Sequence, residues 1–466
     1  MASDSVAVIG VASGLVVGLD PPGEDPRDDG GRTRRLALSV GTSFVAQGVS
    51  MAAGIITLPV ALHYLGRPSF GLWAAVSSLM VWGALLDLGV SRGLSNALAE
   101  AHGRDDRAAA RAYMSTSFFG LASVAVALGA AALLVVPRVD WASLLGVHDT
   151  SPQMVEHSVG AAVAVFLVGL PLGIVPNAYA AYQRQFVANV FAMLGTVASL
   201  VALVAAARLG ASLPVLILSL GMTGNVVSAL NLIALTTRTL PWLRMSPRAV
   251  TREAWTRLRT SAIPLFLYQL GALLVNETQI VVLARRSGLG TVADYAVAMR
   301  LYLAIASLIA IGTSAFAPTL REAFERDDTA WLRRGFLGMV TIRVALSAAA
   351  GLMFVFAGND LLRLWIGQGV VQFSPGVWVL LAVLMLVAVW VTAFSDLLMS
   401  LDHIWVQVGL VMLNGVVTVV LTYVLAPGHG VLGVLIASLA TSLVLLTWLM
   451  PLLTRRLVKP LVELRS

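Results

Sequence analysis

Four ionisable residues lie inside otherwise apolar stretches of the sequence: Asp87, Glu277, Arg300 and Arg343. A charge placed in hydrocarbon is costly, so residues of this kind are functional candidates by default. A buried carboxylate can bind a coupling cation such as H+ or Na+, and a buried guanidinium can bind a phosphate or another anion. The chemistry that the sequence offers is therefore cation and anion binding within a membrane.

Glu277 follows Asn276 in the stretch LLVNETQIVVL, from Leu273 to Leu283. It lies roughly 10 Å below the end of its predicted span, and Arg300 lies roughly 12 Å deep on the next, antiparallel span. We expect these two charges to pair, because each would lower the desolvation cost of the other. The pair could simply pin two helices together. Alternatively, it could line an aqueous cavity, with Glu277 and Asn276 binding the coupling ion and Arg300 an anionic cargo.

Arg343 and Asp87 are the other two charges within spans. Arg343 lies near the middle of its span with no obvious carboxylate at the same depth, although Asp396 and Asp402 are candidates. An unpaired arginine at this depth would face water or a phosphate, so Arg343 is a second candidate for binding the cargo. Asp87 is expected to pair with Arg92 at the membrane surface, and we retain Asp87 and Asp396 as secondary site candidates.

Four prolines within spans are candidate hinges. Pro171 and Pro176 lie five residues apart in the stretch GLPLGIVPN, where they can open the helix backbone. Pro59 and Pro264 occupy roughly similar places in the two halves of the chain. These prolines either permit alternating access or produce static kinks.

An all-α polytopic membrane protein must position these residues. Of 466 residues, 58% are hydrophobic and 12% are charged, and the mean hydropathy is +0.87. No single soluble core could bury so much apolar surface, and the apolar segments are too long for barrel strands. The sequence therefore predicts 12 transmembrane helices at 37–62, 70–90, 112–136, 157–180, 186–207, 212–236, 260–284, 292–317, 334–357, 376–399, 403–426 and 430–453.

The distribution of arginine predicts the orientation. Of the 31 basic residues, 23 fall in segments on the side of the N-terminus, six fall on the other side and two lie within spans. The positive-inside rule then places both termini in the cytoplasm of a multi-pass cell-membrane protein. The net charge of +7 reflects this membrane topology, so we expect no nucleic acid as a partner.

The longest cytoplasmic connector divides the chain into two sets of six helices. The expected parts are a disordered tail at 1–35, a six-helix lobe at 36–236, a linker at 237–259, a second six-helix lobe at 260–455 and a C-terminal tail at 456–466.

The linker contains a predicted amphipathic helix. Ser246 and Pro247 are typical of a helix start, and Val250, Ala254 and Leu258 then recur every four residues. Such a helix could lie on the anionic inner leaflet, or it could be an ordinary solvated connection.

Catalytic motifs are not found in the sequence. It has no Walker A, GxSxG or HExxH pattern, its six histidines are scattered, and it has no cysteine. The predicted outside loops are also too short to form a catalytic domain. We therefore expect no enzyme activity, no cofactor and no metal centre. A coupling ion, H+ or Na+, is expected to bind.

Three segments carry a resemblance to a known family. The segment Tyr64 to Arg111, with LGRPSFGLW and LLDLGVS, resembles the second-helix region of polysaccharide (O-antigen-type) flippases. GLGTVADYAVAMRL, from Gly288 to Leu301, resembles the loop between the seventh and eighth helices of that family, and GHGVLGVLIASLATSLV, from Gly428 to Val444, resembles its last helix. The order and spacing of these segments make the resemblance fairly specific over most of residues 36–455.

The resemblance implies the MATE-like fold of the multidrug/oligosaccharidyl-lipid/polysaccharide (MOP) exporters, with two six-helix lobes around a central cavity. It implies transfer of an undecaprenyl-pyrophosphate-linked oligosaccharide between leaflets, driven by an ion gradient, with polymerase or glycosyltransferase partners. By position, Arg300 and Arg343 would fill the family's cationic role, and Glu277 lies where relatives often have an acidic or amide residue.

Two alternatives stay open. A cation-coupled multidrug exporter would share the fold, and a non-transporting membrane scaffold belongs to a different functional class. Ionisable residues in both the seventh and the eighth predicted spans argue against the scaffold. Twelve predicted helices also argue against a lipid II flippase, because those relatives usually have fourteen.

Overall fold

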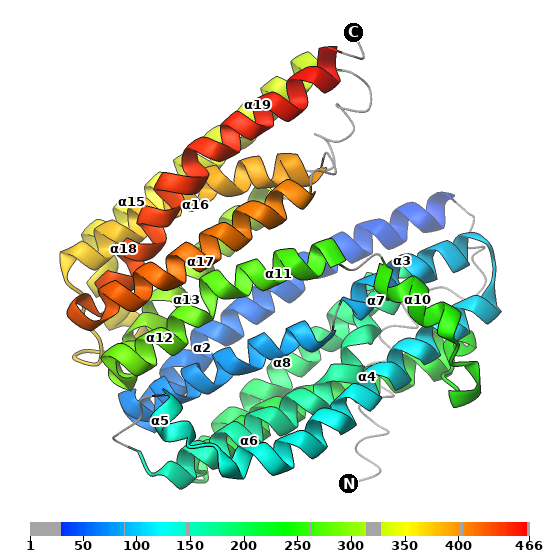
Figure 1. Cartoon of the computed structure of the whole chain (residues 1–466), viewed down its shortest axis with the longest axis horizontal. Coiled ribbons are helices and arrows are strands. Elements are labelled where there is room, and N and C mark those ends of the chain that lie inside the picture. Colours follow the sequence, from blue (N-terminus) through cyan, green and yellow to red (C-terminus); the bar gives the residue numbers. More distant parts are fainter. Residues whose placement is uncertain are drawn as a thin grey trace. The chain divides into compact units, whose positions relative to one another are not determined.

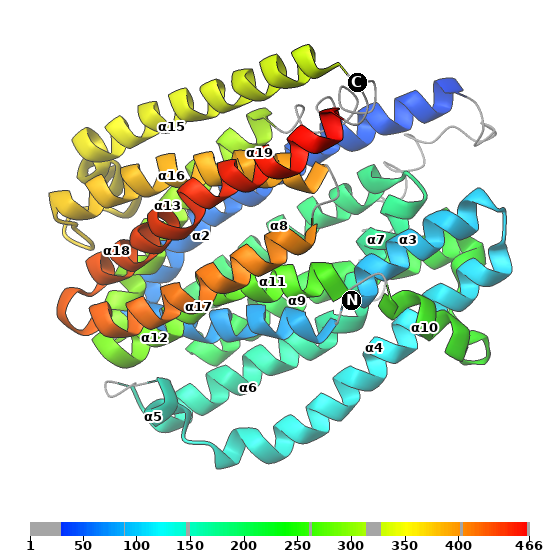
Figure 2. The same cartoon turned by 45° about the horizontal axis from the view of Figure 1, so that its top comes forward.

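The chain folds entirely into helices and turns over the residues that its computed structural model describes, which are 29–87, 89–145, 150–260, 263–313, 328–400 and 404–463. No strand occurs in these ranges, which confirms the all-α prediction. The helices form two compact units, each described separately below, and Figures 1 and 2 show their helices in two views. Unit 1 comprises Met1–Tyr64, Trp82–Ala142 and Thr150–Ile263, and unit 2 comprises Leu65–Val81, Ser143–Asp149 and Pro264–Ser466.

The first half of the chain contains most of unit 1. Its helices are α2 (Asp29–Gly83), α3 (Val90–Gly103), α4 (Arg107–Val135), α5 (Trp141–Leu145), α6 (Pro152–Gly169), α7 (Val175–Ala181), α8 (Gln185–Arg208), α9 (Leu213–Ala234) and α10 (Arg252–Thr260).

The second half of the chain contains most of unit 2. Its helices are α11 (Ile263–Asn276), α12 (Thr278–Ser287), α13 (Leu289–Thr313), α15 (Thr329–Ile366), α16 (Pro375–Ser400), α17 (Ile404–His429), α18 (Val431–Thr441) and α19 (Thr447–Glu463).

Eleven helical segments in the described ranges are long and apolar enough to cross a membrane. The first of them, Leu38–Gly83, contains two predicted spans, which meet at Gly66. Gly66 has φ 72° and ψ 167°, a conformation that glycine adopts without strain and that interrupts the helix. Over the residues that the structure describes, each of the twelve predicted spans therefore coincides with a helical segment. Below, the inner side is the side of the membrane at which α2 begins.

The N-terminal boundary differs from the expectation. α2 begins at Asp29, so the structure places residues 29–35, which we expected in the disordered tail, in a helix. Arginine is a good helix former, and the arginines that follow Gly31 allow the first span to continue beyond the membrane. Residues 1–28 of the predicted tail lie outside the described residues.

The outer part of the second span belongs to unit 2. The segment Leu65–Val81 packs there although the chain on both sides of it belongs to unit 1. Arg67 forms an ion pair with Asp294 on α13. Gly71 lies so close to the backbone of Leu289 that a larger residue would not fit. The second span is therefore shared between the two units.

The linker helix is shorter than predicted and has a different cap. Pro247–Ala249 forms a single 3-10 turn, and α10 begins only at Arg252. The hydroxyl of Thr251, rather than that of Ser246, accepts a hydrogen bond from the backbone N of Ala254, at 3.2 Å. The position of the polar cap residue thus sets the start of this helix.

The apolar face of α10 is covered by protein. Ala254 and Leu258 are buried, and Leu258 belongs to the hydrophobic core of unit 1. Both views show α10 beside α3 and α4 (Figures 1 and 2). Ala254 and Leu258 therefore pack within unit 1, whereas Val250, before the start of α10, is exposed. Contact of the linker helix with the inner leaflet stays a prediction.

An ion-pair group also attaches α10 to α3. Arg257 donates from Nη2 to Glu100 Oε2 at 2.7 Å, and Arg104 pairs with the other carboxylate oxygen. The hydrogen bond from Arg257 and the two positive charges hold the pKa of Glu100 below its ordinary value. The linker is thus fixed to unit 1 by both apolar and charged contacts.

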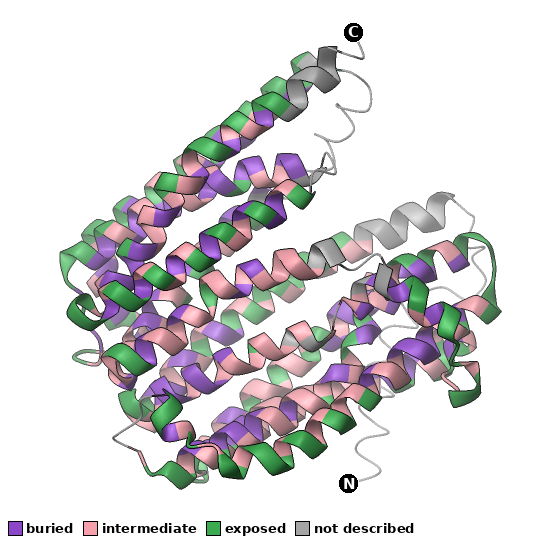
Figure 3. Ribbon diagram, viewed as in Figure 1, coloured by how far each residue is buried: buried purple, intermediate pink, exposed green. Residues whose placement is uncertain are grey.

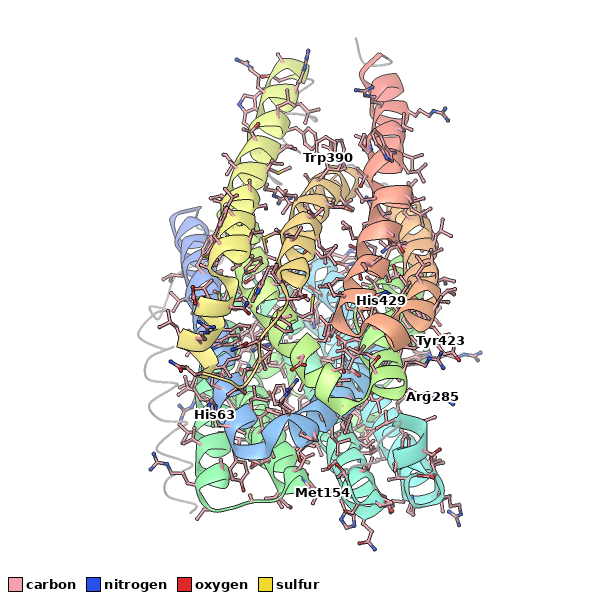
Figure 4. All side chains as sticks on the ribbon, turned by 90° about the vertical axis from the view of Figure 1, so that its left-hand side faces the viewer. His63, Met154, Arg285, Trp390, Tyr423 and His429 are labelled. Carbon is pink, nitrogen blue, oxygen red and sulfur yellow. The ribbon has the colours of Figure 1, made fainter. Side chains whose placement is uncertain are left out.

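Burial follows the faces that helices turn toward one another within each unit. Exposed positions are frequent along α4 and α15, whereas α16 is mostly buried or half-buried (Figure 3). In unit 2, Trp390 on α16 donates to the carbonyl of Thr447, at 3.2 Å. Figure 4 shows Trp390 on the side of α16 that faces α19. That carbonyl would otherwise lack a helical partner, because the residue four positions later is Pro451.

Candidate functional site

A break in the seventh span carries the most polar stretch of unit 2. α11 ends at Asn276 and α12 begins at Thr278, so Glu277 stands at the junction. Asn276 donates from Nδ2 to the carbonyl of Ala272, at 2.8 Å. Glu277 is half-buried, and its side chain does not cap α12. The break therefore holds a carboxylate inside a membrane span.

Glu277 and Arg300 do not form the expected ion pair, although the structure describes both side chains. Instead, α12 and α13 meet through a hydrogen bond from the Tyr295 hydroxyl to Gln279 Oε1, at 2.8 Å. At about 100° per residue, Glu277 lies about 200° around the helix from Gln279, and Arg300 lies about 140° from Tyr295. The pairing prediction is wrong because similar depth does not place two residues on facing sides.

Gln279 links three helices of unit 2. Besides accepting from Tyr295, it donates from Nε2 to Ser438 Oγ on α18, at 3.0 Å. Its side chain is almost completely buried. Polar side chains buried in a membrane protein are stabilised by such interhelical hydrogen bonds, so Gln279 is a satisfied structural link.

Close approach of α11 and α17 begins at two glycines. A Cβ atom on Gly271 would lie 2.7 Å from Val411 Cγ1 and 3.0 Å from the backbone N of Met412. A Cβ atom on Gly415 would lie 2.8 Å from Leu274 Cβ. Only glycine fits at either position, so the two helices pack backbone to backbone.

The same interface contains polar residues that we call the α12–α17 seam. Asn414 lies at the level of the glycine contacts, and Thr278 of α12 with Thr418 and Thr422 of α17 lies farther outward. Thr278 is seven residues after Gly271, and a seven-residue step returns to nearly the same helix face. Thr418 and Thr422 are related in the same way to Val411 and Gly415.

The seam contains polar oxygens without partners. No described group hydrogen-bonds to Thr278 Oγ1, Asn414 Oδ1, Thr418 Oγ1 or Thr422 Oγ1, and all four atoms are buried. Most buried polar atoms in proteins have a partner, so each exception needs an explanation. Oxygen atoms are the ligands that hard cations such as Na+ prefer, and Glu277 directly precedes Thr278 in the chain. Together they form the candidate functional site.

Arg343 lies elsewhere in unit 2 and is paired. It is 6% exposed, and it donates from Nη1 to Asp396 Oδ2 and from Nε to Thr313 Oγ1, each at 2.8 Å. The expectation of an unpaired arginine is wrong, and Asp396, one of the two carboxylates considered, is its partner. A long side chain can carry the guanidinium away from the depth of its Cα atom, which sequence position alone does not reveal. Asp402 lies outside the described residues.

Arg300 is the more accessible of the two candidate cations. Its side chain is exposed on α13 and makes no ion pair within the described part of the chain.

Asp87 serves as a helix cap. One carboxylate oxygen accepts from the backbone N and the hydroxyl of Ser91, at 3.2 and 3.0 Å, at the start of α3. A negative charge is favourable at this end of a helix. The side chain of Arg92, its expected partner, lies outside the described side chains.

The fourth span is opened where sequence predicted a hinge. Leu170–Ile174, which contains Pro171, is a 3-10 turn, and Pro176 lies in the first turn of α7. Asn225 on α9 donates from Nδ2 to the carbonyl of Val165, at 2.8 Å, and so satisfies a backbone oxygen beside the opening. The prolines produce a change in helix type that a neighbouring amide supports.

The other two candidate hinges lie in regular helix. Pro59 is within α2, where Nδ1 of His63 lies 2.8 Å from the Pro59 carbonyl. Pro264 is in the first turn of α11, a position that proline tolerates, and its side chain lies outside the described ones.

Sequence reasoning missed the α17 residues of the seam. Asn414, Thr418 and Thr422 recur every four residues in an apolar span, which puts them on one helix face. This spacing could have identified the seam from the sequence, but the search for site residues concentrated on ionisable residues and did not include it.

Two sequence comparisons bear on these observations. The family model described as "Polysaccharide biosynthesis protein" matches residues 36–324, more than half of the chain. Comparison with curated proteins finds no match.

Solved structures share the fold. An inward-facing multidrug resistance MATE family transporter of the MOP superfamily has a TM-score of 0.72 and 16% identity, with 89% of this chain and 96% of that chain covered. The outward-facing conformation of such a transporter has a TM-score of 0.61 and 15% identity, with 94% and 97% covered. A MOP superfamily transporter from Pyrococcus furiosus, described as having a binding pocket of reverse polarity, has a TM-score of 0.59 and 15% identity, with 91% and 98% covered.

Proposed function

The chain belongs to the polysaccharide biosynthesis protein family and has the fold of the MOP-superfamily membrane transporters, and from this premise we propose that it is a flippase. Its cargo is an undecaprenyl-pyrophosphate-linked oligosaccharide, the repeat unit of a surface polysaccharide. It moves this cargo from the inner to the outer leaflet of the cell membrane by alternating access of the two lobes to a central cavity. The observation that carries the proposal is the family match over residues 36–324, because it associates the transporter fold with polysaccharide synthesis.

The proposed orientation has both termini in the cytoplasm. It rests on the excess of arginine in the segments on the N-terminal side. In this orientation the cargo reaches the protein from the side on which a lipid-linked oligosaccharide is assembled, and a polymerase or glycosyltransferase would be its partner at the membrane.

Reconstitution tests the cargo. Purified full-length chain is placed in vesicles that contain a fluorescent undecaprenyl-pyrophosphate oligosaccharide, and a membrane-impermeant quencher reports which leaflet holds the label. We expect the label to change leaflet only in vesicles with the protein and an ion gradient. Movement of a fluorescent cationic drug, without movement of the lipid-linked sugar, would instead identify a multidrug exporter. If neither moves, the chain is a scaffold and the transport proposal fails.

We propose that Glu277 and the α12–α17 seam form the coupling-ion site. The carboxylate at the helix break supplies charge, and the unpartnered oxygens of Thr278, Thr418 and Asn414 supply neutral ligands. A sodium ion needs several such oxygens, whereas a proton needs only the carboxylate. The two ions can therefore be distinguished by which residues matter.

Replacement of Glu277 by glutamine should abolish gradient-driven flipping while leaving the protein folded in the membrane, because the amide cannot carry the charge that the ion compensates. The matched control is Glu253→Gln on the exposed face of α10, which should flip normally. The measurement is the flipping rate at several ion gradients. An unchanged gradient dependence in Glu277→Gln would remove this residue from the coupling step.

Thr418→Val removes one hydroxyl at nearly constant volume. If the ion is Na+, we expect the sodium concentration that half-saturates flipping to rise by about tenfold, as for loss of a supporting ligand. Thr441→Val is the matched control, because Thr441 is equally buried but its hydroxyl already bonds to the carbonyl of Ala437, at 2.8 Å. Loss of coupling in Glu277→Gln with normal coupling in Thr418→Val would identify H+.

Arg300 is the residue that we propose to contact the pyrophosphate. It is an exposed guanidinium on α13 without an ion-pair partner in the described residues, and guanidinium groups bind phosphate in bidentate fashion. We do not propose that Arg343 contacts the cargo, because it is buried and two of its N–H groups already donate to Asp396 and Thr313.

A further inference from the structure

Three exposed arginines lie next to one another at the inner end of unit 1. Arg107 and Arg111 are one helical turn apart at the start of α4. Arg111 donates from Nε to the backbone carbonyl of Arg244 in the linker, at 3.0 Å. The guanidinium of Arg107 lies 4.9 Å from the ring centroid of Trp242, two residues before Arg244. These contacts place Arg107, Arg111 and Arg244, here called the arginine group, on one small part of the surface.

The arginine group is not neutralised by carboxylates. Within the described part of the chain, none of its three members forms an ion pair. The neighbouring carboxylates are engaged otherwise: Asp106 accepts from the backbone N of Ala109 as the cap of α4, and Glu100 pairs with Arg104 and Arg257. Like charges one helical turn apart are unfavourable, so this arrangement favours a bound anion.

The linker is held in position beside α4 independently of these charges. The backbone N of Ser246 donates to Ser115 Oγ, at 3.1 Å, and that of Thr251 donates to Thr116 Oγ1, at 3.2 Å. Both hydroxyls belong to buried side chains of α4. Arg244 is therefore kept near Arg111 by backbone hydrogen bonds and does not depend on a ligand for its place.

The arginine group is expected at the level of a membrane surface, because the predicted span 112–136 begins directly after Arg111. Tryptophan is typical of the membrane–water interface, and Trp242 stands among the three arginines. Since Ala254 and Leu258 of α10 are buried inside unit 1, the exposed arginines of the linker are available for contact with the membrane.

We propose that Arg107, Arg111 and Arg244 bind the headgroup phosphate of an anionic phospholipid at this surface. Guanidinium groups match phosphate geometry, and basic pockets beside transmembrane helices bind anionic lipid headgroups. The lipid would hold the linker against the membrane as a fixed part of unit 1. This proposal does not depend on the identity of the transported cargo.

The test compares two double variants that remove the same charge from the same face. In Arg111→Gln/Arg244→Gln two members of the arginine group are lost. In Arg248→Gln/Arg252→Gln two exposed linker arginines outside it are lost. Binding of phosphatidylglycerol, cardiolipin and phosphatidylcholine to the purified full-length chain is measured by native mass spectrometry. Elution volume and circular dichroism verify that each variant is folded.

We expect the wild-type chain to prefer phosphatidylglycerol and cardiolipin over phosphatidylcholine. The first double variant should bind phosphatidylglycerol about twenty-five-fold more weakly, from about fivefold for each arginine, and the second should change binding by less than about twofold. Equal losses in both variants would show a general surface charge and overturn the proposal. Equal binding of phosphatidylcholine, or displacement of phosphatidylglycerol by equimolar undecaprenyl pyrophosphate, would overturn the assignment to an anionic phospholipid.

Discussion

Within each unit the first span contacts the fifth through polar side chains, but the hydrogen bonding of these side chains differs between the units. In unit 1, Asn189 of α8 donates to Thr42 Oγ1, at 3.1 Å, and to Ser43 Oγ, at 2.8 Å, on α2. In unit 2 the corresponding spans meet at the α12–α17 seam, where no described group partners the side-chain oxygens of Thr278 and Thr418. In unit 1 the amide of Asn189 has partners on α2, although the hydroxyl of the neighbouring Ser39 has no described partner; in unit 2 none of the four oxygens of the seam has one.

The depth of each contact makes this difference meaningful. Asn189 lies about 6 Å from the start of α8, and Thr418 lies about 21 Å from the start of α17. Water can satisfy a polar atom near the surface, but an unsatisfied atom in the hydrocarbon region costs several kcal/mol. Apolar residues would hold the two helices together without unsatisfied oxygens. The unpartnered oxygens of the seam near mid-membrane therefore support the proposal that they bind an ion.

The largest effect that we predict concerns a satisfied contact of unit 2, the pair of Arg343 and Asp396. Asp396→Ala leaves a buried guanidinium without its carboxylate and should destabilise the protein by about 3–5 kcal/mol. Arg343→Ala should cost less, because the side chain of Asp396 is 43% exposed whereas that of Arg343 is 8% exposed. Thermal unfolding in detergent, followed by tryptophan fluorescence, shows which of the two single variants loses more stability.

The double variant Arg343→Met/Asp396→Leu is the control for this pair. With both charges replaced by apolar groups, most of the lost stability should return, as at other buried ion pairs. Equal stability losses in the two single variants would contradict the burial difference on which the prediction rests.

Much of this architecture follows from the sequence. Continuous apolar stretches fix where helices can span a membrane, and the twelve predicted spans coincide with helices because the bilayer allows few alternatives. The helix break at Glu277 was not predicted, because the seventh span was expected to be continuous over 260–284 and Glu277 was expected to pair with Arg300.

Side-chain partners were harder to predict, for a geometric reason. The depth of Glu277 and Arg300 was inferred from position along the chain, but the helix faces depend on which residues pack, here Gln279 and Tyr295. The same limit applies to α10, where periodicity identified an apolar face but not whether protein or lipid covers it. Periodicity gives a direction on one helix, and only tertiary packing shows what lies there.

A direct comparison of the two polar contacts gives the second prediction. Asn189→Leu should destabilise unit 1 by about 1–2 kcal/mol, from about 0.6 kcal/mol for each interhelical hydrogen bond. Asn414→Leu should cost less stability or none, because the buried Asn414 Oδ1 has no described partner to lose. The flipping assay should show the reverse order, with the larger loss of ion dependence in Asn414→Leu. Equal effects of both variants in both assays would contradict the distinction between a structural helix contact at Asn189 and an ion site at Asn414.

The smallest effect is expected for the ion pairs of Glu100, which lie outside the predicted spans. They show how little an exposed polar contact contributes, for comparison with the Asn189 contact and the α12–α17 seam. Glu100 pairs with Arg257 and Arg104, and these partners lower its pKa in the folded chain from the usual 4.5. A lowered carboxyl pKa contributes stability that is present above pH of about 4.5 and is lost as the pH falls through the folded value. We therefore expect amide exchange in α10 to be faster in Glu100→Gln than in the wild type at pH 7, and the two rates to converge as the pH falls through the folded pKa of Glu100. Since the contact is exposed to water, where salt screens it, the difference at pH 7 should also shrink at high salt. A difference that persists after the pH has fallen through the folded pKa would mean that the amide disturbs α10 by its shape, and the charge-preserving Arg257→Lys would then be the comparison.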